Sequence, residues 1–188
     1  AKKDRYIEVL GLSEYDASVL IADKEATVLF EDCLPFLSKS MTSEAAAKAV
    51  ANWINVDLNR MKNEHKSTWD EIRIKPTELA KLVLLVDNGK VSNSMAKNLF
   101  DEMFINGGDP NKIAEEKGLS QINDTESIQN IVSETLLENP SAVDDYLSGK
   151  DSAVRFLVGQ IMKKTKGQAN PQVASEMVTI ELENRREP

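Results

Sequence analysis

Apolar side chains recur at helical spacing along most of the chain. One stripe follows Asp23, a residue that can cap a helix, and consists of Val28, Leu29, Cys33, Leu34 and Leu37. A second follows Thr42-Ser43-Glu44 and consists of Ala46, Val50, Trp53, Ile54, Leu58 and Met61. Spacings of three and four residues are typical of amphipathic helices. A shorter helix is predicted after Ser13, which precedes two acidic residues in a first turn.

A second series of helices is predicted from residue 75 onward. Prolines stand where helices should begin, at Pro76, Pro110, Pro140 and Pro171, because the first helical position needs no N–H. Ser92 begins another helix, and Asn123 with Glu126 resembles a capping box. The segment Leu79–Val86 is almost uniformly apolar, so its helix should be central. The last two helices are expected from Asp151 to about Lys166 and from Pro171 to about Glu183.

No segment shows sustained alternation of apolar and polar residues, so we predict an all-α protein. Periodicity is lost after Asn63, around the only histidine, His65, which is interpreted as a solvated loop residue. Trp69, Ile72 and Ile74 then resemble an extended segment leading to Pro76. The expected organisation is therefore two small helical domains, residues 1–74 and 75–188.

Composition excludes several classes of function. The 188 residues carry a net charge of −8, which argues against a general nucleic-acid binder or a DNA-binding protein. No apolar stretch is long enough to cross a membrane. A single cysteine and a single histidine exclude a disulfide framework, a Cys-rich zinc module and histidine-based nucleophilic catalysis. Cys33 is interpreted as a buried hydrophobe in a protein of a reducing compartment, the cytoplasm.

Motifs for catalysis, cofactors or metals are missing. The sequence contains no GxxxxGK[ST], GxGxxG, HExxH, CxxC or GxSxG pattern, so we expect neither catalytic residues nor a metal site. Gly107-Gly108-Asp109-Pro110 resembles a phosphate loop, but a glycine helix stop followed by an aspartate cap explains all four residues. The start Ala1-Lys2-Lys3-Asp4 lacks an initiator methionine, and a fragment of a longer protein is expected.

One segment departs from the acidic background. Between Gly149 and Asn170 lie five cations, Lys150, Arg155, Lys163, Lys164 and Lys166, against the single acid Asp151. On one helix, four residues fall within a sector of about 80°, and we call them the cationic ridge: Arg155, Gly159, Lys163 and Lys166. The bare backbone of a glycine admits either a phosphate strand or a closely packed neighbouring helix, and the pattern favours neither.

The turn after the ridge carries further candidates. Gln168 and Asn170 lie just before a predicted helix that begins at Pro171, and a helix N-terminus favours an anion. For the lysines, an ordinary solvated face explains the charge as well as a binding site does. The charge pattern alone therefore marks a candidate anion-binding surface.

Several stretches resemble one family, the C-terminal part of the GatB subunit of the aspartyl/glutamyl-tRNA amidotransferase. The most specific run from Phe156 to Lys163 and from Lys166 to Pro171, together with the residues at 12–17, 51–54, 106–110 and 139–140. By this resemblance, residues 1–74 are a helical linker domain and residues 75–188 a tail similar to the YqeY family. The large catalytic part of the family, with its ATP and Mg²⁺ chemistry, is missing, so no cofactor is expected here.

The resemblance implies a part that engages tRNA, in a complex with amidotransferase subunits A and C. Such a part would hold the tRNA body while another part converts Glu-tRNA(Gln) or Asp-tRNA(Asn). From the charge pattern we predict RNA contacts at Lys150, Arg155, Lys163, Lys164, Lys166, Gln168 and Asn170. Two alternatives stay open: a domain that docks on partner subunits or a synthetase, and an independent amidase.

Overall fold

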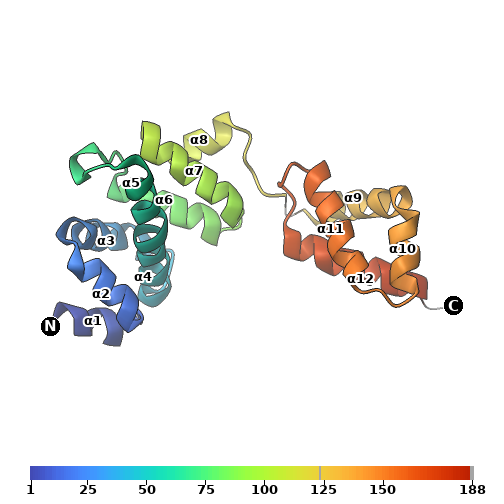
Figure 1. The fold of residues 1–188 in the computed structure, drawn as a ribbon, viewed down its shortest axis with the longest axis horizontal. Coiled ribbons are helices and arrows are strands. Elements are labelled where there is room, and N and C mark those ends of the chain that lie inside the picture. The colour runs from blue at the N-terminus through green and yellow to red at the C-terminus, as the bar shows by residue number, and fades with distance from the viewer. Residues whose placement is uncertain (123, 187–188) are drawn as a thin grey trace. The chain divides into compact units, whose positions relative to one another are not determined.

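The computed structural model describes residues 1–122 and 124–186 (Figure 1). Within these residues it contains helices and no strand, and the one β-type contact is an isolated bridge between Ile122 and Ala169. The prediction of an all-α protein is confirmed. The chain divides into two compact units: unit 1 comprises residues 1–88 and 93–118, and unit 2 comprises residues 89–92 and those from 119 onward.

Unit 1 contains eight α-helices and two short helical segments of other types. The α-helices are α1 (Lys2–Glu8), α2 (Glu14–Ala22), α3 (Lys24–Leu37), α4 (Ser43–Asn52), α5 (Asn59–His65), α6 (Pro76–Asp87), α7 (Asn93–Asn106) and α8 (Pro110–Glu116). The π-helical segment η1 (Trp53–Leu58) joins α4 to α5, and a 3₁₀ turn, η2 (Trp69–Glu71), precedes α6. Helix α6 lies among α3, α4, α7 and α8, so its predicted central position is confirmed.

The predicted caps begin the helices of unit 1. The Ser13 hydroxyl, the Asp23 carboxylate and the Thr42 hydroxyl accept backbone N–H bonds at the starts of α2, α3 and α4. Asp109 caps α8 with Pro110 in its first turn, which confirms that residues 107–110 are a helix stop and start. Each cap satisfies donors that the first helical turn leaves free.

The core of unit 1 contains the stripes that the sequence predicts. Cys33 is fully buried on α3, beside Phe30 and Leu37, and its thiol lies 3.4 Å from the carbonyl oxygen of Pro76. Burial, with a smaller contribution from Asp32, raises the pKa of this thiol to about 12. Cys33 is therefore an inert core side chain, as expected.

The packing division falls elsewhere than the expected domain boundary. Residues 74 and 75 lie inside unit 1, because α6 buries Leu79, Leu82 and Val83 among its neighbouring helices. His65 is exposed as expected but is the last residue of α5, and Trp69–Glu71 form a 3₁₀ turn rather than an extended segment. The reciprocal bonds of Thr68 and Glu71 close that turn.

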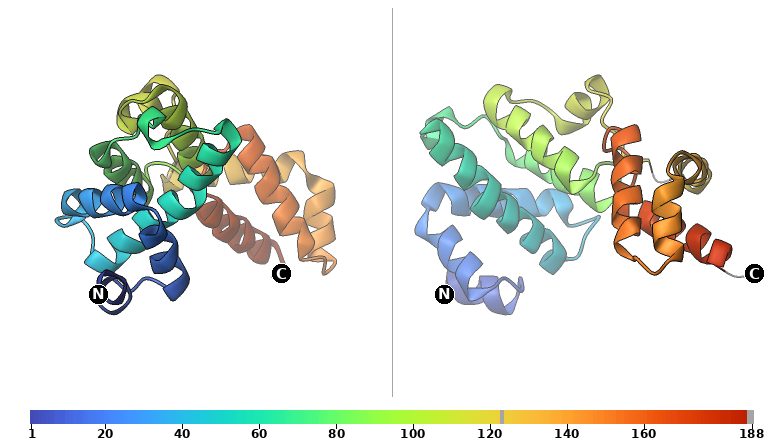
Figure 2. Two further views of the ribbon diagram at one scale, coloured as in Figure 1. Left: turned by 60° about the vertical axis from the view of Figure 1, so that its left-hand side comes forward. Right: turned by 45° about the vertical axis from the view of Figure 1, so that its right-hand side comes forward.

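Unit 2 consists of α9 (Thr125–Glu138), α10 (Pro140–Leu147), α11 (Ser152–Lys164) and α12 (Pro171–Arg186). Helix α11 packs against the other three, and Figures 1 and 2 show it beside α10 and α12. The hydrophobic core of unit 2 includes Ile128, Val132, Leu136, Leu157, Ile161, Val178 and Leu182. Asn123 of the expected capping box lies outside the described residues, and the carboxylate of Asp124 accepts the N–H of Ser127 at the start of α9. No described helix has the length and apolar character that a bilayer crossing requires.

Candidate nucleic-acid interface

The cationic ridge is set by the buried stripe on the opposite side of α11. Ala153, Leu157 and Ile161 point into the core of unit 2. Arg155, Gly159 and Lys163 follow one another at intervals of four residues and are all exposed. Residues four apart lie on one face of a helix, so these three form one exposed strip along α11. The predicted placement of the three on one face is confirmed.

Lys166, the fourth member of the ridge, lies beyond the helix. Helix α11 ends at Lys164, and Lys166 has a left-handed backbone with φ 51°. The buried Thr165 stabilises this turn, because its hydroxyl donates to the carbonyl oxygen of Ile161 at 2.9 Å and accepts the N–H of Ala169 at 3.2 Å. The expected helix to Lys166 is therefore two residues too long. Lys166 remains an exposed cation at the C-terminal end of the ridge.

Gly159 leaves the backbone of α11 bare on the exposed strip. A Cβ atom at this position would meet no described heavy atom within 4 Å. Close packing of a neighbouring helix, one of the two explanations of this glycine, is therefore not found within the described chain. The space beside Gly159 is open to an approaching molecule.

Two of the five candidate cations are paired with acids. The ammonium of Lys150 lies 3.0 Å from Asp145. The ammonium of Lys164 lies 2.9 Å from Glu138 and 3.2 Å from Glu134, and its hydrogen bond to Glu138 raises its pKa. These pairs reduce the net positive charge that either lysine presents to an approaching polyanion.

The other three cations, Arg155, Lys163 and Lys166, form no ion pair with a described residue, and their side chains are exposed. Arg155 lines an open hollow of about 570 Å³ with Asp151, Ser152, Val154, Val158 and Ser175. Asp151 is the single acid among these lining residues. The structure thus places Arg155 and Lys163, which pair with no described residue, on the same face of α11 as Gly159, and the exposed Lys166 lies in the turn that follows the helix.

Asn170 and Gln168 have structural partners. The side-chain oxygen of Asn170 accepts the N–H groups of Gln172 at 3.1 Å and Val173 at 3.3 Å, so it caps α12. The first-turn donors that were expected to attract an anion are thus already bonded. The carbonyl oxygen of Gln168 accepts the N–H of Ile122 at 2.5 Å, beside the bridge to Ala169. The dipeptide Asn170-Pro171 predicts this cap, because asparagine is favoured as an N-cap and proline at the first helical position.

Sequence reasoning gave no role to Phe156. This ring lies off the buried stripe of α11 and is 51% exposed. It is three residues from Gly159, so it lies near the exposed strip. Unstacked RNA bases bind to aromatic faces of this kind. The sequence did contain one indication of an exposed ring, because Phe156 falls outside the otherwise regular apolar stripe of α11.

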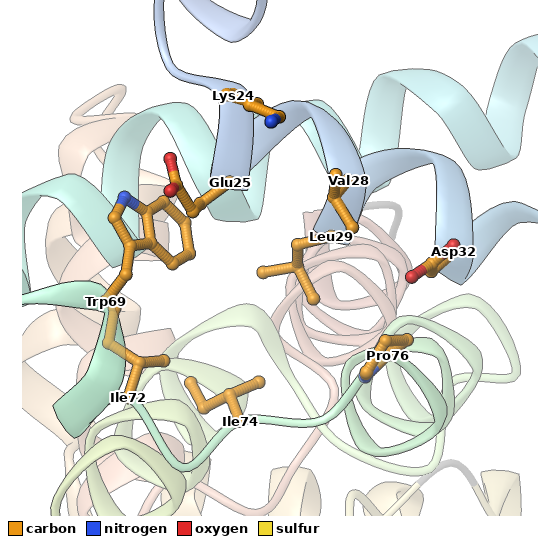
Figure 3. A pocket seen from close by; sticks show the side chains of 9 residues that line it. All are labelled: Lys24, Glu25, Val28, Leu29, Asp32, Trp69, Ile72, Ile74 and Pro76. Atoms are coloured by element: carbon orange, nitrogen blue, oxygen red, sulfur yellow. The ribbon is translucent and has the colours of Figure 1, made fainter.

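Unit 1 has an apolar hollow of another kind, which we call the α3 groove (Figure 3). Its volume is about 300 Å³, and Figure 3 shows Leu29 of α3 opposite Ile74, with Trp69 and Ile72 at one end. A neighbouring hollow shares Asp32 and Pro76 with it and is also lined by Pro35, Phe36, Lys75 and Thr77. Val28 is 49% exposed and Phe36 53% exposed along this wall of α3.

The described residues hold no group of three or more His, Cys, Asp or Glu side chains placed to bind a metal ion. The charged features of unit 2 and the apolar features of unit 1 therefore contain no candidate metal centre. These charged and apolar features are instead surfaces that other molecules could contact.

Comparisons with known proteins agree on one family. A family model described as the GatB domain matches residues 36–182. Proteins named as the B component of the aspartyl/glutamyl-tRNA(Asn/Gln) amidotransferase are 45% identical over 98% of the chain in Oceanobacillus iheyensis and 45% identical over 97% in Caldicellulosiruptor bescii. The chain spans 37% of the length of these relatives. The chain belongs to the GatB domain family.

Proposed function

We propose that this chain holds the body of a tRNA on the cationic ridge of α11. The observation that carries the proposal is the pair of exposed cations Arg155 and Lys163 on either side of the bare backbone of Gly159, followed by the exposed Lys166 beyond the helix; none of the three forms an ion pair with a described residue. Double-stranded RNA is bound mainly through phosphates, 2′-hydroxyls and overall shape, so a rigid cationic helix face suffices. The acidic surplus of the chain, −8 overall, would confine the RNA to this face.

The names of the relatives fit this role. Each is named as a component of an amidotransferase that acts on aspartyl- or glutamyl-tRNA. We propose that the chain is a non-catalytic part of such a component in the cytoplasm. By the family resemblance, residues 1–74 would be its helical linker and residues 75–188 its YqeY-like tail, a division that differs from that of the two packing units. Subunits A and C would be its partners, and the ATP and Mg²⁺ chemistry would belong to the rest of the GatB protein. Glutamine, ATP and misacylated tRNA added to the chain alone should give no amide product.

A titration with tRNA tests the binding proposal. The chain should bind tRNA more tightly than it binds heparin, a polyanion without the shape of RNA. Reversing two ridge charges, with Lys163→Glu and Lys166→Glu, should weaken tRNA binding at least about tenfold, because attraction to phosphates becomes repulsion. The matched control is Lys39→Glu with Lys112→Glu, two exposed lysines of unit 1. Equal affinity for tRNA and heparin, together with no effect of the ridge reversal, would remove the basis of the proposal.

The α3 groove favours a second candidate function, docking on a partner subunit. Val28 lines the α3 groove and Phe36 lines the hollow next to it; both are large exposed apolar side chains of α3, and such patches mark protein contacts. Phe36→Lys should then prevent co-elution of the chain with subunits A and C but leave tRNA affinity unchanged. Co-elution that survives Phe36→Lys would contradict docking on this apolar face of α3.

A further inference from the structure

A buried carboxylate lies in the π-helical segment of unit 1. Asp57 belongs to η1, between α4 and α5, and its side chain is only 4% exposed. Short π-helical segments inside longer helices are frequent at functional sites, because the extra residue changes where side chains point. The proposed roles of the cationic ridge and of the α3 groove leave this carboxylate without a function.

The carboxylate of Asp57 has one described ion-pair partner, the guanidinium of Arg60, and that pair is long. No described residue donates a hydrogen bond to it, and its ion pair with Arg60 spans 3.8 Å. Arg60 lies closer to other acids, 2.6 Å from Asp101 and 3.2 Å from Glu64. Burial therefore raises the pKa of Asp57, although Lys97 and Arg60 lower it and Asp101 raises it further. A buried carboxylate without donors is costly unless a cation or donor joins it.

Asp57 lines an open hollow of about 430 Å³. The hollow lies between the α4 and η1 segments, the end of α6 and the start of α7. Its apolar walls come from Met41, Ala49, Trp53, Val83 and Val86, and its polar groups are Asn52, Asp57, Asp87, Asn93 and Lys97. Asp87 supplies a second carboxylate, and Lys97 is exposed and forms no ion pair with Asp57. Trp53 is held in place by stacking on Phe100, with ring centroids 5.1 Å apart.

We propose that this hollow is a binding site for a guanidinium or ammonium group, with Asp57 as its acceptor. The buried carboxylate gains the donors that it lacks, and Asp87 adds a second negative charge. The ring of Trp53 attracts a cation, and Val83 and Val86 suit an aliphatic stem. Either a free small cation or an arginine or lysine side chain of another protein carries this chemistry.

Methylguanidinium and its neutral counterpart methylurea are suitable probes. The indole N–H resonances of Trp53 and Trp69 are followed by NMR in the 188-residue chain at constant ionic strength. Methylguanidinium should shift the Trp53 resonance in a saturable way, whereas methylurea should not. Trp69 lies at the α3 groove and not at this hollow, so it serves as an internal control. Equal shifts with both probes, or no saturable shift, would overturn the proposal.

Asp57→Asn keeps the shape of the side chain and removes the charge. It should weaken methylguanidinium binding at least about tenfold, because the charge-assisted bond is lost. The matched control Glu115→Gln neutralises an exposed acid of α8 and should leave binding unchanged. Lys97→Met should strengthen binding, since it removes a competing cation. Undiminished binding by Asp57→Asn would overturn the assignment of Asp57.

Two further arms keep the proposal testable if Asp57→Asn fails to fold. Acidification of the unmodified chain should weaken methylguanidinium binding while the fold persists, because protonated Asp57 no longer attracts a cation. Binding that is independent of pH down to acid unfolding would count against Asp57. An N-acetylarginine amide binds more tightly than methylguanidinium if the natural occupant is a protein side chain, and less tightly if it is a free small cation.

Discussion

The ammonium of Lys164 lies 2.9 Å from the carboxylate of Glu138, an acid at the end of α9. Lys163, its neighbour in sequence, forms no ion pair with a described residue. Adjacent residues of a helix lie about 100° apart, so one lysine meets the acids of α9 while the other extends into solvent. The two lysines should therefore contribute unequally to RNA binding.

Single alanine substitutions test this inequality. Lys163→Ala should lower tRNA affinity roughly fivefold and reduce the slope of log affinity against log salt by about one, as expected for one lost phosphate contact. Lys164→Ala should change the affinity less than about twofold, because Glu134 and Glu138 already balance its charge. Filter binding at several salt concentrations measures both quantities. Equal losses for the two variants would contradict the role assigned to the ion pairs.

Gly159→Ala separates stability from binding. Glycine inside a helix costs about 0.5–1 kcal/mol relative to alanine, and the added methyl group meets no described atom within 4 Å. The variant should therefore be more stable toward urea. Its tRNA affinity should nevertheless fall, because the methyl group stands where we place the close approach of a phosphate strand. A stabilised variant with unchanged tRNA affinity would show that RNA does not approach α11 at this residue.

The candidate site was predictable from sequence only in part. Helical spacing placed Arg155, Gly159 and Lys163 correctly on one face. It could not show that Lys164 is paired, because Glu138 belongs to α9 and only the tertiary packing of α9 against α11 brings the two together. Lys150 lies after α10, outside any helix, so helical spacing did not indicate its pair with Asp145, five residues earlier. Helical spacing also extended α11 to Lys166, because the buried Thr165, around which the chain turns, has no clear signature in the apolar pattern.

Asp23 links the start of α3 to the turn before α6, and its charge should make stability depend on pH. Partial burial alone would raise the pKa of Asp23, but bonds from the N–H of Ala26, the indole of Trp69 and the ammonium of Lys62 hold it below 3.8. A carboxyl group whose pKa is lower in the folded than in the unfolded state stabilises the fold at pH values above its unfolded-state pKa. This stabilisation is lost as the pH falls through the folded-state pKa. Asp23 should thus stabilise unit 1 at neutral pH.

Asp23→Asn preserves a capping side chain and removes the charge. Urea unfolding should show that the variant is less stable than the unmodified chain above about pH 5 and that the difference shrinks as the pH falls below 3.8. Asp23→Ala also removes the cap of α3 and should cost a further amount of about 1 kcal/mol. A difference between Asp23→Asn and the unmodified chain that stays constant from neutral to acid pH would contradict the role of the charge.

The fold was largely predictable because caps and apolar stripes act locally. Ser13, Asp23 and Asp109 begin helices as predicted. Helix α1 was not expected, since its seven residues show one buried side chain, Tyr6, and no stripe. The π segment also went unpredicted, because the stripe from Ala46 to Met61 fits a continuous helix. The division into units depends on long-range packing of α6, which local patterns do not report.

Leu157→Ala tests whether the two units unfold separately. Leu157 is fully buried in unit 2, and truncation of a core leucine costs about 2–5 kcal/mol. Hydrogen exchange followed by NMR should show reduced protection in α9 and α11, with the protection of α3 and α6 unchanged. The matched variant Leu82→Ala should give the reverse pattern. Equal loss of protection in both units after either substitution would mean that they unfold together.

Crosslinking of this chain to tRNA, with the modified residues mapped, tests the central proposal most directly. The ridge on α11 predicts crosslinks concentrated between Arg155 and Lys166, with Phe156 among them, and their loss when Lys163 and Lys166 are both changed to Glu. Crosslinks confined to unit 1, or spread evenly over exposed lysines of both units, would contradict a tRNA-holding role for the cationic ridge.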